Sequence, residues 1–178
     1  MPKILRFKIR RLVLISALFF STIGCDQVTK VVARDAFRVQ SPLSFFGDVF
    51  RIQVAQNPGA FLNLGAGMHA QARFWVFTVG VALMLAACLA LLLWRKSMDK
   101  ILTIGLTLVV AGGVGNLIDR ILYGSVTDFL NLGVGELRTG IFNIADMAVV
   151  AGVLVCVWRS GASRRRFEDG RSGNFFTL

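Results

Sequence analysis

Acidic residues are scarce in this sequence of 178 residues, which contains 10 Asp and Glu against 20 Lys and Arg. Charged residues make up only 17% of the chain, whereas ordinary soluble domains contain about 25%. Cysteine occurs three times, too seldom for a disulfide framework, and a hydrophobic content of 55% excludes a disordered chain. The composition therefore indicates a single domain embedded in a membrane.

Long hydrophobic runs are what the sequence has in abundance. A helix needs about 20 residues to cross the hydrocarbon core of a bilayer. The run at 74–94 contains no charged residue, and three other runs carry charged residues only near one end. The sequence therefore predicts an all-α polytopic membrane protein, a single domain over residues 1–178, with four transmembrane helices at about 12–32, 74–94, 101–122 and 141–158.

Basic residues are divided unevenly between the two sides of these spans. Thirteen of the 20 Lys and Arg residues fall in the amino-terminal segment, in the link between the second and third spans, and in the tail at 159–178. Cytoplasmic segments of membrane proteins carry the excess of Lys and Arg. We therefore expect both termini in the cytoplasm and a poorly ordered tail. This topology explains the net charge of +10 without nucleic acid as a partner.

The two remaining segments, at about 34–73 and 123–140, are predicted to be outward loops. In the longer one, hydrophobic and polar residues alternate from Phe50 to Ala55, as in a half-buried strand, and Asn57-Pro58-Gly59 is typical of a turn. We expect a small extracytoplasmic β element there, on the outer face of the membrane. The shorter loop contains four glycines and is expected to be irregular.

Polar side chains of three spans fall at one predicted depth, near the outer membrane surface. They are Asp26 and Lys30 of the first span, Asn116, Asp119 and Arg120 of the third, and Asn143 and Asp146 of the fourth. Spacings of three and four residues place each set on one helix face. Inserting an Asp at a helix centre costs about 3 kcal/mol, so intramembrane carboxylates are candidates for function. A purely structural role for the pairs Asp26–Lys30 and Asp119–Arg120 stays open.

Asp146 has no basic residue on its own helix face and therefore needs a partner from elsewhere. Asp128 lies between Val126 and Phe129, in a segment whose apolar residues favour folding back onto the membrane face. From there its carboxylate meets Asp146. Two adjacent carboxylates share a proton, so one acts as a base on water while the other, protonated, polarises a carbonyl. This chemistry hydrolyses a peptide bond without a metal or cofactor.

Five runs of residues resemble the lipoprotein signal peptidases (signal peptidase II) in order and spacing: DQVTK (26–30), NPGAF (57–61), GGVGNLIDR (112–120), VTDF (126–129) and FNIAD (142–146). Members of that family are aspartyl endopeptidases of the bacterial inner membrane. They remove the signal peptide from diacylglyceryl-modified prolipoproteins by cutting before the lipid-bearing cysteine. The resemblance implies this activity, prolipoprotein substrates and membrane lipids as partners, a monomer, and an active site near the periplasmic face.

The resemblance also assigns roles to individual residues. It implies that Asp128 and Asp146 are catalytic and that a second set binds substrate or orients this pair: Asn57, Asn116, Asp119, Arg120 and Asn143. Asp26 and Lys30 match a family motif with a structural role. The chain departs from the family at Pro58 and Phe61, where the family more often reads Asn-Thr-Gly-Ala-Ala-Phe, and Pro58 removes one backbone donor. The longer loop corresponds to a β cradle for the substrate.

Several alternatives stay open at this point. A proton-coupled transporter would also bury carboxylates, but it would need them in the cytoplasmic halves of the spans too. A metal-dependent lipid-head-group transferase would use Asp119, Asp128 and Asp146 as oxygen ligands and would be sensitive to chelators. A non-enzymatic scaffold would tolerate loss of the acids. Residues 1–25 also resemble a lipoprotein signal ending at Cys25, although three later spans favour an uncleaved protein.

Overall fold

A computed structural model of the chain describes residues 3–37, 42–59, 65, 67–95 and 98–172. Its elements are α1 (Lys3–Phe37), β1 (Leu43–Phe45), β2 (Phe50–Asn57), α2 (Ala70–Arg73), the π-helical η2 (Phe74–Gly80), α3 (Val81–Trp94), α4 (Lys100–Tyr123), β3 (Val126–Val134), β4 (Leu137–Arg138) and α5 (Ile144–Ser172). Four helical segments are long and apolar enough to cross a membrane: Lys8–Phe37, Ala70–Trp94, Lys100–Tyr123 and Ile144–Ala162. The predicted four-span protein with a small β element is confirmed.

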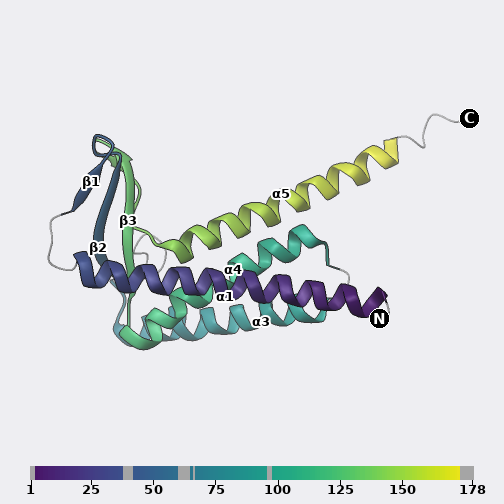
Figure 1. The fold of residues 1–178 in the computed structure, drawn as a ribbon, viewed down its shortest axis with the longest axis horizontal. Coiled ribbons are helices and arrows are strands. Elements are labelled where there is room, and N and C mark those ends of the chain that lie inside the picture. Colours follow the sequence, from purple (N-terminus) through teal and green to yellow (C-terminus); the bar gives the residue numbers. More distant parts are fainter. Residues whose placement is uncertain (1–2, 38–41, 60–64, 66, 96–97, 173–178) are drawn as a thin grey trace, which may run out of the picture.

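The helices lie along one another, the sheet stands across one end of the bundle, and both termini lie at the other end (Figure 1). Helix α4 contacts α1, α3 and α5. Three of its glycines make these approaches close. A Cβ atom on Gly112 would collide with the backbone of α5, and one on Gly113 would come within 2.5 Å of Leu85 in α3. A Cβ on Gly115 would lie 2.7 Å from the carboxylate of Asp26 in α1. These glycines therefore let the neighbouring helices pack closely against α4.

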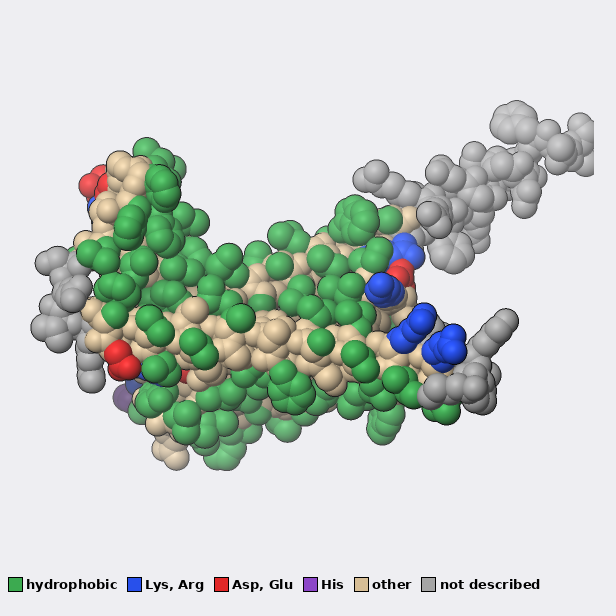
Figure 2. Space-filling view, viewed as in Figure 1, with side chains coloured by type: hydrophobic (Ala, Val, Ile, Leu, Met, Phe, Trp, Pro, Cys, Tyr) green, Lys and Arg blue, Asp and Glu red, His purple; other side chains and the backbone are tan. Residues whose placement is uncertain are grey.

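Large apolar side chains cover the outside of the bundle, where Figure 2 shows them over most of the helical surface. Phe20, Leu83 and Trp94 are 70%, 67% and 82% exposed. In the first span, by contrast, the charged side chains of Asp26 and Lys30 lie inside and are fully buried. An apolar exterior around a polar interior suits a protein whose solvent is lipid.

The sheet joins the two outward loops. Its strands run in the order β1-β2-β3-β4, and each pairs with its neighbour in antiparallel fashion. The strand predicted in the longer loop is confirmed as β2. The prediction that the shorter loop is irregular is wrong, because residues 126–134 form β3, with Asp128 opposite Ala55 of β2. A distant strand supplies the hydrogen bonds that hold this glycine-containing segment extended, so its own pattern did not indicate a strand.

Two predicted helix boundaries also differ. Helix α1 continues to Phe37, so that Arg34 lies on the helix rather than in a loop. Helix α5 begins at Ile144 rather than at 141 and continues to Ser172, which makes the prediction of a poorly ordered tail from 159 wrong for residues 159–172. No proline interrupts either extension. Phe142 forms a bridge with Leu130, so the residues before α5 extend the sheet instead of the helix.

Candidate active site

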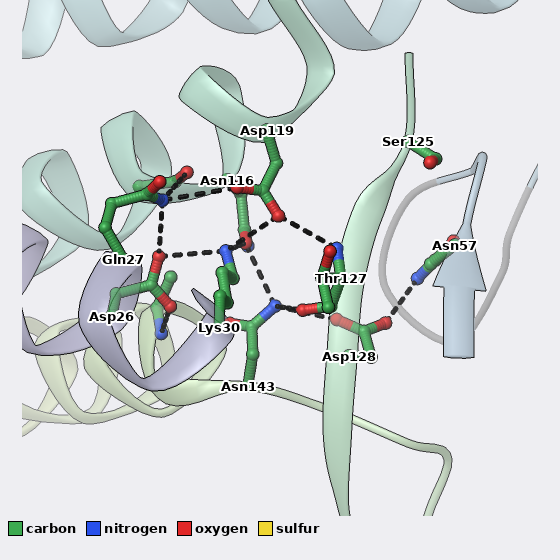
Figure 3. A network of polar contacts seen from close by, with 12 residues as sticks. Asp26, Gln27, Lys30, Asn57, Asn116, Asp119, Ser125, Thr127, Asp128 and Asn143 are labelled. Atoms are coloured by element: carbon green, nitrogen blue, oxygen red, sulfur yellow. Dashed lines mark hydrogen bonds and ion pairs between the residues drawn. The ribbon is translucent and has the colours of Figure 1, made fainter. Parts of the chain in front are cut away.

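A cluster of polar side chains lies where the sheet meets α1, α4 and α5 (Figure 3). We call it the polar cluster, and its members are Asp26, Gln27, Lys30, Asn57, Asn116, Asp119, Thr127, Asp128, Asn143 and Asp146. The cluster brings together residues from two strands and three helices that lie far apart in the sequence. It contains every predicted site residue except Arg120, which lies at its edge.

Asn143 and Asp146 form a capping box at the start of α5. The side-chain oxygen of Asn143 accepts the backbone N–H of Asp146 at 2.9 Å, and Oδ2 of Asp146 accepts the backbone N–H of Asn143 at 3.1 Å. The expectation that Asn143 lies inside the fourth helix is therefore wrong, because it is the capping residue. This local pairing fixes the carboxylate of Asp146 in the first turn of α5.

Asn143 also connects the two predicted catalytic acids. Its Nδ2 donates to Oδ1 of Asp128 at 2.7 Å and to Oδ1 of Asn116 at 3.0 Å. In turn, Nδ2 of Asn116 donates to Oδ1 of Asp146 at 2.8 Å. Asp128 and Asp146 are thus hydrogen-bonded to one asparagine, which lies between a strand and a helix.

Asp128 is 3% exposed on β3, beside the end of β2. Asn57 donates from Nδ2 to its Oδ2 at 3.0 Å, and the side-chain oxygen of Asn57 accepts the N–H of Gly59 in the turn that follows. Burial raises the pKa of Asp128 to about 6, with a further increase from the charge of Asp146, while the hydrogen bond from Asn57 lowers it. This carboxyl group therefore keeps a proton far more readily than an ordinary aspartate does.

Lys30 lies at the centre of the polar cluster and is fully buried. Its Nζ lies 2.8 Å from Oδ2 of Asp26 and 3.5 Å from Oδ2 of Asp119, and it donates to Oδ1 of Asn116 at 2.9 Å. The predicted Asp26–Lys30 pair is confirmed. The alternative pairing of Asp119 with Arg120 is wrong, because Arg120 donates to the carbonyl of Gly59 at 2.8 Å, in the turn after β2, while Asp119 pairs with Lys30.

The two carboxylates beside Lys30 each hold a stretch of backbone. Oδ1 of Asp26 accepts the N–H of Ala145 at 2.9 Å, and Oδ2 of Asp119 accepts the N–H of Thr127 at 2.9 Å. Ala145 directly precedes Asp146, and Thr127 directly precedes Asp128. The buried carboxylates therefore anchor the chain one residue before each predicted catalytic acid.

Three residues that take part in this arrangement, Gln27, Thr127 and Arg34, were not singled out from the sequence. Gln27 donates to Oδ1 of Asp119 at 3.3 Å and to the carbonyl of Gly115 at 3.1 Å. Arg34 donates to Oγ1 of Thr127 at 3.0 Å and lies 3.9 Å from Asp119. Gln27 stands inside the DQVTK run, which was the available signal. Arg34 was missed because its segment was assigned to a loop.

A groove between α3, α4 and α5 leads to Asp146. Its volume is about 390 Å³, and its walls are apolar except where Asn116, Arg120 and Asp146 line it. Pro58, one of the two departures from the family pattern, is half-buried beside Gly59, while Phe61 lies outside the described residues. The site thus combines a carboxylate with an apolar channel that opens between spans.

Comparison with known proteins agrees with this arrangement. The family model for signal peptidase (SPase) II matches residues 18–161. The lipoprotein signal peptidase of Syntrophus aciditrophicus is 36% identical over 144 residues, which cover 79% of this chain and 89% of the relative. That of Paraburkholderia phymatum is 35% identical over 137 residues, 75% of this chain and 78% of the relative.

Two solved structures share the fold. Both are bacterial membrane enzymes. One has a TM-score of 0.70 at 21% identity over 92% of this chain and 93% of its own, and the other has a TM-score of 0.69 at 23% identity over 82% and 90%. These two structures confirm the fold, and the family match and the relatives confirm the family resemblance that the five runs indicate. This chain belongs to the signal peptidase II family, the lipoprotein signal peptidases.

Proposed function

We propose that this protein is an aspartyl endopeptidase in which Asp128 and Asp146 together activate water to cut a diacylglyceryl-modified prolipoprotein before its lipid-bearing cysteine. Removal of signal peptides from prolipoproteins follows from the family. The observation that supports the finer mechanism is the hydrogen bonding of both acids to Asn143, at 2.7 Å for Asp128 and 3.1 Å for Asp146. The charge of Asp146 also raises the pKa of Asp128, so the two acids interact, and we infer that they hold a single proton between them.

The reaction needs one ionised and one protonated carboxyl group. The ionised group removes a proton from water, whose oxygen adds to the carbonyl carbon of the scissile bond. The protonated group donates to the carbonyl oxygen and stabilises the tetrahedral intermediate. The C–N bond then breaks as the C=O bond forms again and returns its proton to the second carboxyl group. The leaving nitrogen, which becomes the amino group of the cysteine, takes up the proton gained from water. A protonated Asp128 suits this chemistry, because burial raises its pKa to about 6.

The remaining residues of the polar cluster position this pair. Asn57, Asn116 and Asn143 each donate to a carboxylate oxygen of the two acids. Asp119 and Asp26 hold the backbone ahead of them, and Lys30 neutralises both of these anchors. We assign Arg120 to substrate binding, because it lines the groove together with Asp146. Asp26 and Lys30 keep a structural role.

The apolar parts of a lipidated prolipoprotein match the apolar walls of the groove. An apolar signal helix and acyl chains enter sideways from lipid, and the groove opens between α3, α4 and α5 with apolar walls. The sheet lies at the end of the bundle away from both termini (Figure 1). Because most Lys and Arg residues fall at the termini and in the α3–α4 link, we assign that end to the cytoplasm and the site to the periplasmic face.

The metal-dependent alternative fits the described contacts less well. It would require Asp119 as an oxygen ligand beside Asp128 and Asp146. The carboxylate of Asp119 instead accepts hydrogen bonds from Thr127 and Gln27 and pairs with Lys30. The ammonium group of Lys30, 3.5 Å from this carboxylate, would repel a cation bound there.

Cleavage of a defined substrate tests the proposal. The purified full chain in detergent is incubated with a diacylglyceryl-modified prolipoprotein, with and without a chelator, and with the same prolipoprotein lacking the lipid. We expect equal cleavage in both lipidated samples and none of the unlipidated substrate. Inactivation by the chelator, reversed by adding a divalent metal, would contradict a water-activating aspartate pair and favour the metal mechanism.

A further inference from the structure

A second cavity lies at the end of the bundle opposite the sheet, between residues 10–17 of α1 and the start of α4. Its volume is about 730 Å³. Val13, Leu14 and Ala17 of α1 give it an apolar wall, while Arg10, Arg11 and Lys100 supply three cations. We call it the basic cavity. The proposed peptidase reaction uses none of these residues.

The positive charge of the basic cavity is not neutralised by its acidic residue. Asp99 accepts the N–H of Ile101 at 2.9 Å with one oxygen and pairs with Arg159 through the other. The Ile101 N–H and the Arg159 guanidinium hold the pKa of Asp99 below its usual range, so this carboxylate stays ionised and engaged. Arg10 and Lys100 are exposed and form no ion pair within the part of the chain that the structure describes.

Arg11 is held in place by main-chain groups. Its Nη1 and Nη2 donate to the carbonyls of Arg95 and Leu92, each at 2.6 Å, at the carboxyl end of α3. Its Nε is buried and has no hydrogen-bond partner among the described residues. Figure 2 shows Lys and Arg side chains gathered at this end of the bundle.

We propose that the basic cavity binds one anionic phospholipid, with its phosphodiester between Arg10 and Lys100 and the start of an acyl chain along the wall formed by Val13, Leu14 and Ala17. The positive charge of the cavity rim is complementary to the phosphate of a lipid head group. The apolar wall belongs to a membrane-spanning helix and is complementary to an acyl chain. Basic pockets between spans on the cytoplasmic side bind such head groups. The proposal is independent of the peptidase mechanism.

Lipid titration followed by native mass spectrometry tests this site. The purified full chain in detergent is titrated with phosphatidylglycerol, with zwitterionic phosphatidylcholine, and with inorganic phosphate. We expect one saturable phosphatidylglycerol site, binding of phosphatidylcholine at least tenfold weaker, and no binding of phosphate over the same range. The double variant Arg10→Gln, Lys100→Gln should bind phosphatidylglycerol about 25-fold more weakly, about fivefold for each cation removed.

A matched control separates a defined site from general attraction to a basic surface. Arg6→Gln with Lys8→Gln removes the same charge from the same end of α1, at exposed residues that do not line the cavity. This control should bind as the unmodified chain does. Ala17→Phe narrows the apolar wall without changing the charge and should weaken binding as well. All variants should keep their melting temperature and their rate of prolipoprotein cleavage.

Three outcomes would overturn the proposal. Equal losses in the two double variants would indicate diffuse surface electrostatics. Equal binding of phosphatidylcholine would show that the rim does not recognise the head group. Binding of inorganic phosphate as tight as that of the lipid would show an anion site to which the apolar wall contributes nothing.

Discussion

The two ends of the helix bundle handle charge in opposite ways. At the sheet end, Lys30, Asp26 and Asp119 are fully buried and bind one another. At the end with the termini, Arg10 and Lys100 are exposed, and the Asp99–Arg159 pair is about one-quarter exposed. Buried ion pairs are costly to break, whereas exposed pairs contribute little to stability. The sheet end therefore depends on each member of its polar cluster, and the opposite end tolerates change.

Lys30→Met tests this difference between the two ends and should have the largest effect on stability. It leaves the buried carboxylates of Asp26 and Asp119 without their cation, so we expect a loss of about 3–5 kcal/mol in the free energy of unfolding. Lys8→Met removes an exposed lysine from the same helix and should change stability by less than about 0.5 kcal/mol. Unfolding in a denaturing detergent measures both. Equal stability of the two variants would show that the buried lysine is not needed for the fold.

Asp26→Asn should cost less, about 1–3 kcal/mol, because Lys30 keeps Asp119 as a partner and the amide oxygen still accepts the N–H of Ala145. We expect lower abundance and a lower melting temperature, with turnover per folded molecule largely retained. Quantitative blotting and cleavage assays on the same membranes separate these effects. Normal abundance and melting together with lost turnover would argue against a structural role.

Asn57→Ala tests the sheet end of the bundle through the pH dependence of cleavage. In the proposed mechanism Asp146 is ionised and Asp128 carries the proton of the pair. This proton is lost as the pH rises through the pKa of Asp128, about 6. The value of kcat/KM should therefore fall as the pH rises through that range. The Asn57 hydrogen bond lowers the pKa of Asp128, so its removal should move the fall to higher pH. A shift to lower pH, or none, would contradict the assignment.

Asp99→Asn probes the opposite end and should have the smallest effect. Asparagine still caps α4 by accepting the N–H of Ile101, and only the partly exposed ion pair with Arg159 is lost. We expect a change below about 1 kcal/mol in unfolding free energy and an unchanged cleavage rate. A loss as large as that of Lys30→Met would remove the distinction between the two ends.

The sequence was sufficient for the spans and for most of the candidate site. Hydrophobic runs of membrane length predict the spans, carboxylates at one depth single out Asp146, and the apolar neighbours of Asp128 single out that residue. The catalytic role of both acids stays a prediction. Strand β3 was missed, because its hydrogen bonds come from β2, about 70 positions earlier along the chain. Asn143 was placed inside the helix because its spacing to Asp146 suits a helix face and a capping box equally well.

The most direct measurement is cleavage of a lipidated prolipoprotein by Asp128→Asn and Asp146→Asn, each at the membrane abundance of the unmodified protein. Loss of either acid removes half of a pair that holds one proton, so we expect each variant to lose cleavage, by about 10²-fold or more. Asp48→Asn, which changes an acid at the far end of the sheet, is the matched control and should cleave normally. Retained cleavage by either variant would contradict the aspartate pair.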